Sequence, residues 1–375
     1  MRILIAPDKF KNSLSAREVA DSIAIGLRDI LPDATIEIVP VADGGEGTAE
    51  VICEACAGEW VMCDGHDALG RAITTRYVWL RDRRMAVMEM SEAAGMWRIA
   101  PEERDPFHAS TYGVGEMLLD AARRETNDVV VGLGGSATND GGFGMARALG
   151  FRFLNSDSVE LNGPVSDLLG LEHISSPPDL VLPRVTAATD VRNPLLGARG
   201  ATRIFGPQKG VTPEKVALME DALSRLADVV SRDLGCDFRE IPGAGAAGGL
   251  GFGLVSFCGA HLRCGFDLIA ETLDLEAAIQ RADVVITGEG SLDQQTLEGK
   301  VPAGVAAIAR KHGKRIFAIV GRASEGQEVR HLFDRLWELR QPGMTEQESI
   351  ARARELLRER ARELAPEIQR DTAAA

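Results

Sequence analysis

The chain has 375 residues, of which 45% are hydrophobic and 26% charged, the balance of an ordinary globular protein with room for two domains. Its formal net charge of −14 argues against nucleic acid or an anionic membrane as the main partner, because such partners need clustered lysine and arginine. Asp8, Lys9 and Lys11 interrupt any apolar signal-peptide core, and no apolar run reaches transmembrane length. We therefore expect a cytoplasmic protein whose ligands are small molecules.

The first sixty residues alternate between apolar strand patterns and amphipathic helix patterns. Ser15 and Glu18 form the capping box that opens the first helix, and Pro32 ends that helix. The expected elements are a strand at 2–7, a helix at 15–32, a strand at 35–41 and a helix that includes 51–52. This order is typical of a parallel sheet.

The middle of the chain has a different character. Two strands at 73–80 and 85–90 flank the charged turn 81–84, as in an antiparallel hairpin. The further expected elements are a helix at 111–124, a strand at 129–131, a helix at 143–149, a strand at 185–189, a long helix from 212–213 and a glycine-rich loop at 243–253 before 254–257.

The parallel style returns near residue 283. Strands are expected at 284–286, 316–320 and 333–336, a helix at 301–312, and a last helix capped by Thr345 and Glu348. We therefore predict an α/β protein of two domains: a flavodoxin-like parallel-sheet domain formed by both chain ends (1–60 and 281–375), and an inserted mixed α/β domain (61–280). Clefts between domains are preferred ligand sites.

The six cysteines are predicted to be thiols in a reducing compartment. Cys53 and Cys56 form a C-x-x-C pair with Cys63 nearby, but only His66 could complete a local zinc site. The remaining cysteines are Cys236, Cys258 and Cys264.

Five loops stand where predicted strands end, and each carries an acid. They span residues 8–11, 43–48, 134–142, 189–193 and 288–293. Ligands of open α/β sheets bind outside the carboxyl ends of the strands. Glycine-rich turns before helices suit phosphate, and neighbouring carboxylates suggest Mg²⁺. Lys9, Lys11, Lys209 and Lys300 could neutralise phosphate charge.

Several common catalytic motifs are missing from the chain. It contains no Walker A sequence, no protein-kinase set, no Gly-x-Ser-x-Gly elbow and no Gly-x-Gly-x-x-Gly in its first strand-to-helix turn. The six histidines form neither a triad nor a metal-binding spacing.

The chain resembles the type-1 glycerate kinases along nearly its whole length. The segments that carry the resemblance are 6–15, 42–48, 132–142, 188–191, 205–210, 242–253 and 286–290. Two positions depart from the family pattern: Asn12, where Gly is more frequent, and Ser291, where Arg is frequent. The resemblance implies ATP-dependent phosphorylation of glycerate with Mg²⁺, on a flavodoxin-like domain joined to a second α/β domain. The residues do not choose between 2-phosphoglycerate and 3-phosphoglycerate, nor between a monomer and a homodimer.

Phosphoryl transfer needs positioning, charge neutralisation and a base for the hydroxyl, and the five loops supply candidates. Asp190 and Asp293 are the candidate base and metal ligand, in either order, and Lys9 is expected near the transferred phosphoryl group or the glycerate carboxylate. Asp43 and Glu289 are further metal candidates. The expected substrate- and phosphate-binding residues are Asp8, Lys11, Gly134, Gly135, Ser136, Thr138, Asn139, Asp140, Asn193, Lys209, Gly248, Gly249 and Lys300.

Two other functions remain open at this point. The chain could phosphorylate another short hydroxy acid, or it could be a non-catalytic sensor of a nucleotide or sugar acid. The acidic loops disfavour a sensor, because a sensor needs no base.

Overall fold

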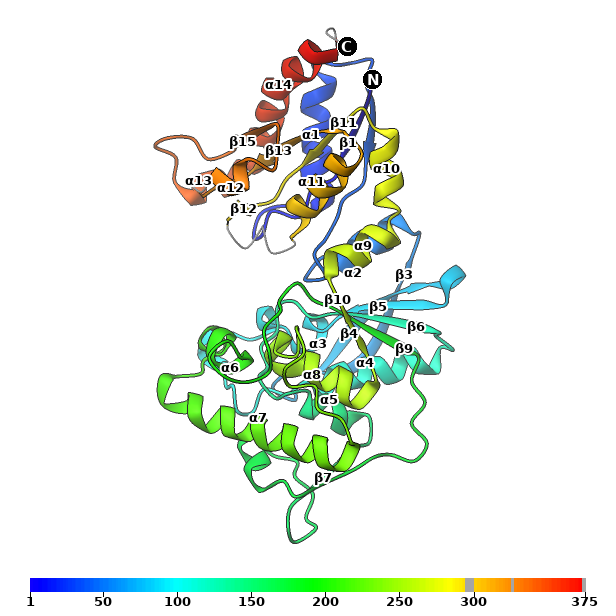
Figure 1. The fold of residues 1–375 in the computed structure, drawn as a ribbon, viewed down its shortest axis with the longest axis vertical. Coiled ribbons are helices and arrows are strands. Elements are labelled where there is room, and N and C mark those ends of the chain that lie inside the picture. Colours follow the sequence, from blue (N-terminus) through cyan, green and yellow to red (C-terminus); the bar gives the residue numbers. More distant parts are fainter. Residues whose placement is uncertain (294–299, 325–326, 373–375) are drawn as a thin grey trace. The chain divides into compact units, whose positions relative to one another are not determined.

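Two sheets organise the chain, one in each of the two units into which its contacts divide it (Figure 1). The structure is a computed structural model that describes residues 1–293, 300–324 and 327–372. Unit 1 comprises Met1–Asp43, Glu50–Ala55 and Cys264–Ala375, and unit 2 comprises Gly44–Ala49 and Cys56–Arg263. The α/β fold predicted from the sequence is confirmed, whereas the division into a domain of residues 1–60 and 281–375 and an inserted domain of residues 61–280 stays a prediction.

Unit 1 contains a five-stranded parallel sheet to which both ends of the chain contribute. Its order is β15-β13-β11-β1-β2, with β1 at Arg2–Ile5, β2 at Thr35–Ile38, β11 at Val284–Thr287, β13 at Arg315–Val320 and β15 at Arg335–Glu338. The central strands are almost entirely buried, as expected for strands with helices on both faces. The strand predicted at 35–41 ends earlier, at Ile38, and the last strand lies two residues later than predicted.

Helices α1 (Ala16–Arg28) and α14 (Ala353–Thr372) pack side by side against this sheet (Figure 1). They approach so closely that a Cβ on Gly26 would lie 2.4 Å from the carbonyl oxygen of Arg358. The predicted capping boxes of Ser15 with Glu18 and of Thr345 with Glu348 are confirmed. The other helices and short strands of this part are α2 (Thr48–Ala55), α9 (Gly265–Thr272), α10 (Leu275–Arg281), β12 (Ser291–Leu292), α11 (Val301–Lys311), β14 (Arg322–Ala323), α12 (Gln327–Arg330) and α13 (Glu346–Ala351).

Unit 2 contains a six-stranded mixed sheet in the order β10-β9-β6-β5-β4-β3. The strands are β3 (Glu59–His66), β4 (Ala72–Leu80), β5 (Met85–Glu89), β6 (Asp128–Gly132), β9 (Arg184–Ala188) and β10 (His261–Arg263). The predicted hairpin is confirmed, because β4 and β5 pair antiparallel around a short 3-10 turn at Arg81–Arg83. From β5 to β10 the strands run parallel, so β5, β6 and β9 end at the same edge. Strand β3 was not predicted.

The helices of unit 2 are α3 (Ser91–Ala94), α4 (Tyr112–Arg123), α5 (Phe143–Ala148), α6 (Ala201–Phe205), α7 (Pro213–Leu234) and α8 (Ala246–Cys258). The prediction of a loop over 243–253 is wrong for most of its length, because helix begins at Ala246. Positive φ angles at Ala247, Gly248 and Gly249 (53°, 68° and 89°) interrupt that helix, so its first turn keeps a loop-like backbone. Leu250, Phe252 and Leu254 then anchor it in the core.

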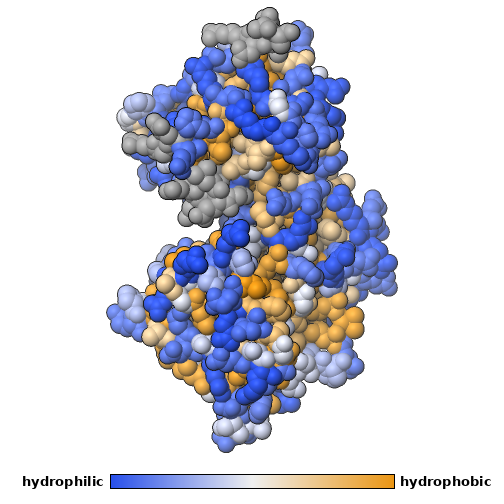
Figure 2. Space-filling model, in the orientation of Figure 1, coloured by the Kyte–Doolittle hydropathy of each residue, from blue (hydrophilic) through white to orange (hydrophobic). Residues whose placement is uncertain are grey.

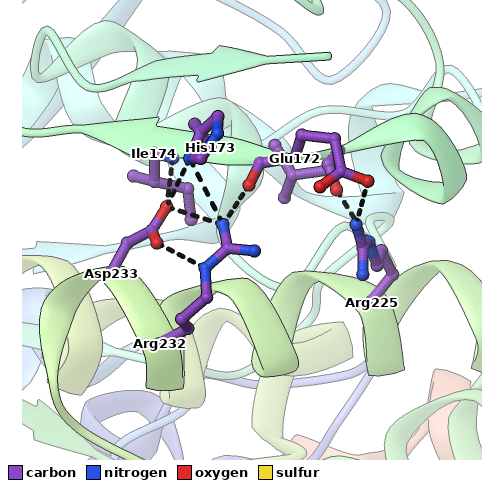
Figure 3. Close-up of polar contacts among 7 residues, drawn as sticks. Glu172, His173, Ile174, Arg225, Arg232 and Asp233 are labelled. Carbon is purple, nitrogen blue, oxygen red and sulfur yellow. Dashed lines mark hydrogen bonds and ion pairs between the residues drawn. The ribbon is translucent and has the colours of Figure 1, made fainter. Parts of the chain in front are cut away.

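Two arginines fasten the long helix α7 to the small hairpin formed by β7 (Arg152–Leu154) and β8 (His173–Ser175) (Figure 3). Arg225 donates to the carbonyl oxygen of Leu171 and to the Glu172 carboxylate, at 2.7 and 2.5 Å. Arg232 binds the Glu172 carbonyl oxygen and the Asp233 carboxylate, which accepts the Ile174 amide at 2.8 Å. We assign these contacts to holding the fold.

The face shown in Figure 2 is largely hydrophilic, with apolar patches between charged side chains. Among the described residues, no helix combines the length and the apolar character needed to cross a membrane.

Candidate functional site

A cavity of about 320 Å³ opens at the carboxyl edge of the unit 1 sheet. The loops after β1, β2, β11 and β13 contribute Asp8, Asp43, Glu289 and Gly321 to its lining. Backbone hydrogen bonds tie these loops together: the Asp8 amide donates to Gly288, and the Gly321 amide donates to Glu289. The position agrees with the general rule that open α/β sheets bind ligands beyond the carboxyl ends of their strands.

Four carboxylates line this cavity, and three of them, those of Asp8, Asp43 and Glu289, follow strands of the sheet. Asp8 and Glu289 are buried, with 8% and 6% of their surfaces exposed. Burial, followed by repulsion from Asp43 and then Glu289, raises the pKa of the Asp8 carboxyl well above its usual range, against a hydrogen bond from the Lys9 amide (2.6 Å). Bringing such groups together is unfavourable unless a cation offsets their charge, and hard carboxylate oxygens are what Mg²⁺ prefers. The described residues nevertheless include no cluster of three or more His, Cys, Asp or Glu arranged to hold a metal by itself.

Five basic residues line the same cavity: Lys9, Lys11, Lys300, Arg322 and Arg340. Lys300 lies 4.0 Å from Asp293, and both side chains are partly exposed. Arg322 and Arg340 were missed by sequence reasoning, although Gly321-Arg322 follows directly on β13, the position that strand-end reasoning marks. Basic side chains around a group of acids suit a phosphate chain that carries a metal ion.

The two departures from the family pattern both lie at this cavity. Asn12 has a φ of 61°, a left-handed conformation that glycine adopts freely and asparagine tolerates, so the exchange introduces little strain. Ser291 accepts a hydrogen bond from Nε of Arg322 at 3.1 Å. An arginine side chain is therefore present beside position 291, although it comes from another strand.

In the glycine-rich loop 134–142 of unit 2, polar groups are hydrogen-bonded to other groups of the protein. Nζ of Lys209 donates to Oγ of Ser136 and to the carbonyl oxygen of Thr138, both at 2.7 Å, and only 2% of this lysine is exposed. Burial lowers the pKa of Lys209 to about 7, although the charge of Asp140 opposes the shift. In this structure the ammonium group serves the loop itself.

Asp140 is also used internally. Its carboxylate accepts the amide and hydroxyl of Thr111 (both 2.8 Å) and the amides of Gly142 (3.0 Å) and Gly144 (3.1 Å). Burial raises the pKa of Asp140, and the hydrogen bonds from Thr111, Gly144 and Gly142 act in the opposite direction. The Asp140 carboxylate thus accepts hydrogen bonds from two amides at the start of α5. A phosphate bound there would need the same two amides.

The neighbouring residues bind the loop to the second glycine-rich segment. The Gly141 amide donates to the Gly248 carbonyl oxygen at 3.0 Å, and a Cβ on Gly248 would lie 2.0 Å from the Thr138 oxygen. Nδ2 of Asn139 donates to Oγ1 of Thr202. Within the described residues, Oδ1 of Asn139 and Oγ1 of Thr138 are buried without a hydrogen-bond partner, so two polar atoms remain unsatisfied inside the loop.

Other predicted residues of unit 2 lie at the carboxyl edge of its sheet. Asp190 follows β9 and is half-buried, and Gly134 follows β6. Asn193 donates to the Arg199 carbonyl oxygen. A Cβ on Gly134 or Gly135 would collide with Gly45 or Glu46, so the chain that carries Glu46 packs against this loop.

The predicted site residues therefore form two groups, one in each unit. Unit 1 holds Asp8, Lys9, Lys11, Asp43, Glu289, Asp293 and Lys300; unit 2 holds Gly134, Gly135, Ser136, Thr138, Asn139, Asp140, Asp190, Asn193, Lys209, Gly248 and Gly249. Sequence reasoning also missed a cavity in unit 2 that includes Glu89, the last residue of β5, and Arg98. The ending of β5 at an acid was the available signal.

Comparison with known proteins places the whole chain. The model of the family described as "Glycerate kinase family" matches residues 3–369. The glycerate 2-kinase of Escherichia coli (strain K12) is 40% identical over 338 residues, which is 88% of each chain, and a glycerate kinase of Halalkalibacterium halodurans is 38% identical over 97% of each. A crystal structure from Salmonella typhimurium LT2, provisionally named glycerate kinase 2, superimposes with a TM-score of 0.87 at 40% identity and covers 100% of this chain and 99% of its own.

The match extends over almost the full length of the chain. This chain belongs to the glycerate kinase family.

Proposed function

We propose that the protein is a glycerate 2-kinase, which transfers the γ-phosphoryl group of ATP to the C2 hydroxyl of (R)-glycerate and releases ADP and 2-phosphoglycerate. The observation that carries the proposal is the unit 1 cavity, where Asp8, Asp43 and Glu289 meet five basic side chains. The choice of the 2-hydroxyl is supported by the relative from E. coli that is named a 2-kinase. A kinase draws on the ATP pool, which supports a cytoplasmic location.

In this proposal the basic residues of unit 1 hold the phosphates of ATP. Lys9 and Lys11 follow β1, and Lys300 directly precedes α11. Their charges neutralise the phosphate oxygens and orient the γ-phosphoryl group. Bound Mg²⁺ would neutralise further phosphate charge, with Asp43 and Glu289 as the protein's oxygen ligands and phosphate oxygens completing its coordination.

The C2 hydroxyl must lose its proton as the oxygen–phosphorus bond forms and the bond to ADP breaks. Asp190 and Asp293 are the proposed groups for this proton and for a second contact to the metal. Asp293 lies 4.0 Å from Lys300, which lines the unit 1 cavity. Asp190 stands at the carboxyl edge of the unit 2 sheet.

The proposal is tested by ³¹P NMR of the product made from ATP and (R)-glycerate. We expect ADP and a signal that matches authentic 2-phosphoglycerate. A 3-phosphoglycerate signal would overturn the regiochemistry, and turnover of lactate, tartronate or erythronate in preference to glycerate would overturn the substrate. Binding of ATP and glycerate without product would indicate a sensor.

The assigned base is tested with Asp190→Asn and Asp293→Asn in a coupled assay of ADP release. We expect the variant that lacks the base to lose about 100-fold or more in kcat, the usual contribution of a general base. If both variants keep near-wild-type kcat and unfold like the wild type, neither residue is the base.

The metal ligands are tested by thermal unfolding with and without MgCl₂. We expect Mg²⁺ to raise the Tm of the wild type and to raise that of Asp43→Asn less, because a ligand that binds only the folded state stabilises it. An equal rise in both proteins would remove Asp43 from the metal site.

A further inference from the structure

Unit 2 contains a second cavity, to which none of the roles above has been assigned. It has a volume of about 460 Å³ and is open to solvent. It is lined by Glu46, Met62, Thr74, Arg76, Glu89, Ser91, Glu92, Trp97 and Arg98. Glu89 ends β5 and Ser91 begins α3, so the cavity lies at the carboxyl edge of the parallel part of this sheet, where ligands are expected.

One side of the cavity is basic. Nε of Arg76 lies 2.9 Å from Oε1 of Glu92, and Nη2 of Arg98 lies 3.4 Å from Oε2 of the same carboxylate. Two guanidinium groups therefore share one carboxylate, which leaves one positive charge in excess on this side. The Arg98 and Glu92 side chains are only 17% and 15% exposed, so water screens the charge of Arg98 less than that of Arg76, which is 48% exposed.

Arg98 is held in place but has hydrogen-bonding capacity to spare. Its guanidinium stacks on the ring of Trp97 at 4.3 Å, and the Trp97 indole donates to the Ser91 carbonyl oxygen at 3.0 Å. Within the described residues, Glu92 is its one side-chain hydrogen-bond partner, and Nε is buried without any. A guanidinium with unused donors on a fixed plane is the group that binds a carboxylate with two parallel hydrogen bonds.

The lining also includes two further acids, Glu46 and Glu89. Glu89 is 8% exposed, and its Oε1 accepts the Ala49 amide at 2.9 Å. Glu46 packs against Gly135, where a Cβ would lie 2.1 Å from its Oε1. Carboxylate oxygens accept hydrogen bonds from hydroxyl groups, and Ser91 adds a hydroxyl of its own.

We propose that this cavity binds a short hydroxy acid, with Arg98 holding its carboxylate and Glu46 and Glu89 accepting hydrogen bonds from its hydroxyls. A purely anionic ligand would be repelled by the two glutamates, and a neutral polyol would leave the excess charge of Arg98 and Arg76 unmatched. The inference rests on the proposed function, in which the hydroxy acid is glycerate. The rival occupant is an adenine ring stacked on Trp97, which is 60% exposed.

The test uses two replacements of Arg98. Arg98→Met keeps the approximate length of the side chain and removes its charge. Arg98→Lys keeps the charge and removes the planar guanidinium that can make two parallel hydrogen bonds. For Arg98→Met we expect the KM and the calorimetric Kd for glycerate to rise about thirtyfold or more, the effect of losing a charge-assisted contact to a carboxylate. For Arg98→Lys we expect a KM and a Kd for glycerate between those of wild type and those of Arg98→Met. The KM for ATP should stay within twofold of wild type in both variants.

A neutral analogue separates a carboxylate contact from a merely structural role. Glyceramide has the hydroxyls of glycerate but no carboxylate. We expect wild type to bind glycerate much more tightly than glyceramide, and Arg98→Met to bind the two about equally. A structural defect would weaken both ligands together and would preserve their ratio.

The matched control is Arg335→Met. Arg335 also lies over a tryptophan ring (Trp337, 5.7 Å) and pairs with a glutamate (Glu367, 2.6 Å), but it lines neither cavity. We expect its glycerate and ATP constants to stay within twofold of wild type.

Several outcomes would overturn the proposal. They are an unchanged glycerate Kd in Arg98→Met, an unchanged ratio of glycerate to glyceramide, or a rise in the KM for ATP in place of that for glycerate. If Arg98→Met does not fold, an unchanged glycerate Kd in Arg98→Lys has the same force. If glycerate binds through Arg98 but is not phosphorylated, the proposed function is refuted and this binding site stands. If glycerate is phosphorylated and Arg98→Met leaves its Kd unchanged, the binding site is refuted and the proposed function stands.

Discussion

The unit 1 cavity and the loop 134–142 of unit 2 look alike in sequence and differ in the structure. Both follow a buried parallel strand and combine glycine with an acid, and a lysine reaches each. In unit 1, Lys9, Lys11 and Lys300 line an open cavity, where burial and the neighbouring acids raise the pKa of Asp8. In unit 2, the side chains of Lys209 and Asp140 form hydrogen bonds with amides, hydroxyls and a carbonyl oxygen of the loop and its neighbours.

The comparison teaches that a glycine-rich loop with charged residues has two uses. Its side chains can be offered to a ligand, or they can satisfy a backbone that must turn sharply inside the protein. Hydrogen-bond satisfaction tells the two apart, because a buried polar group needs a partner and a ligand-binding group keeps some capacity unused. Four variants test this distinction.

The largest effect is expected for Asp140→Ala. Four donors around the carboxylate would lose their acceptor, and the free energy of unfolding should fall by about 4 kcal/mol, since each buried unsatisfied donor costs on the order of 1 kcal/mol or more. Urea unfolding measures the loss. Asp140→Asn keeps one acceptor oxygen and should lose less. A loss of less than about 1 kcal/mol in Asp140→Ala would mean that the carboxylate does not hold the loop.

The opposite pattern is expected for Lys9→Met in unit 1. Activity should fall about 100-fold in kcat/KM, because a charge next to the transferred phosphoryl group is lost, while the unfolding free energy stays within about 0.5 kcal/mol. Steady-state kinetics and urea unfolding on the same preparation measure both. Lys311→Met is the control, because Lys311, the last residue of α11, pairs with Glu276 of α10 and is absent from the lining of the unit 1 cavity. If kcat/KM changes less than threefold, Lys9 is not in the reaction.

Lys209 makes the stability of unit 2 depend on pH. Its pKa is about 7 in the folded protein and near its ordinary value of 10.5 when unfolded, so the unfolded chain binds more protons between these pH values. Stability should therefore rise with pH above 7, by roughly 1 kcal/mol per pH unit from this group. Urea unfolding of wild type and Lys209→Met at pH 7, 8 and 9 isolates the contribution. Parallel pH profiles of the two proteins would contradict the buried ammonium.

The smallest effect is expected for Asp8→Asn. The raised pKa of Asp8 means that its charge destabilises the folded state at neutral pH, so its removal should stabilise the protein by about 1 kcal/mol while activity falls. The gain should disappear as the pH falls through the folded-state pKa of Asp8, because the wild-type carboxyl is then protonated as well. Urea unfolding at pH 7 and pH 4 checks both statements. Equal stability at pH 7 would show that burial and the neighbouring acids do not raise the pKa of Asp8.

Much of the fold could be predicted because its signals are local. Capping boxes at Ser15 and Thr345, apolar strands and their alternation with helices are all written within a few residues. Strand β3 escaped because Trp60 and Met62 are exposed on it, so its apolar residues do not alternate with polar ones. Helix α8 escaped because its glycines read as a loop, whereas close packing requires them: a Cβ on Gly251 would lie 2.2 Å from the Gly243 oxygen.

The sequence predicted where the candidate site residues lie in the fold better than it predicted what their side chains do. Strand-end reasoning selected Asp8, Asp43 and Glu289, which line one cavity. It could not find Arg98, which is the last residue of a short 3-10 turn and is held in place by Trp97 and Glu92. Nothing near Arg98 in the sequence marks it as different from the other arginines of the chain.

By itself, the sequence determined the α/β class, the order of most elements and membership of the glycerate kinase family, because periodicity, caps and loop motifs are short-range features. Only the tertiary structure decided which of the charged residues face a cavity and which face the protein. Lys209 shows the reason: its partners Ser136 and Thr138 lie 73 and 71 residues away in the chain, and no local pattern announces them. Burial and the choice of hydrogen-bond partner arise when distant segments pack, and they assign each charge its role.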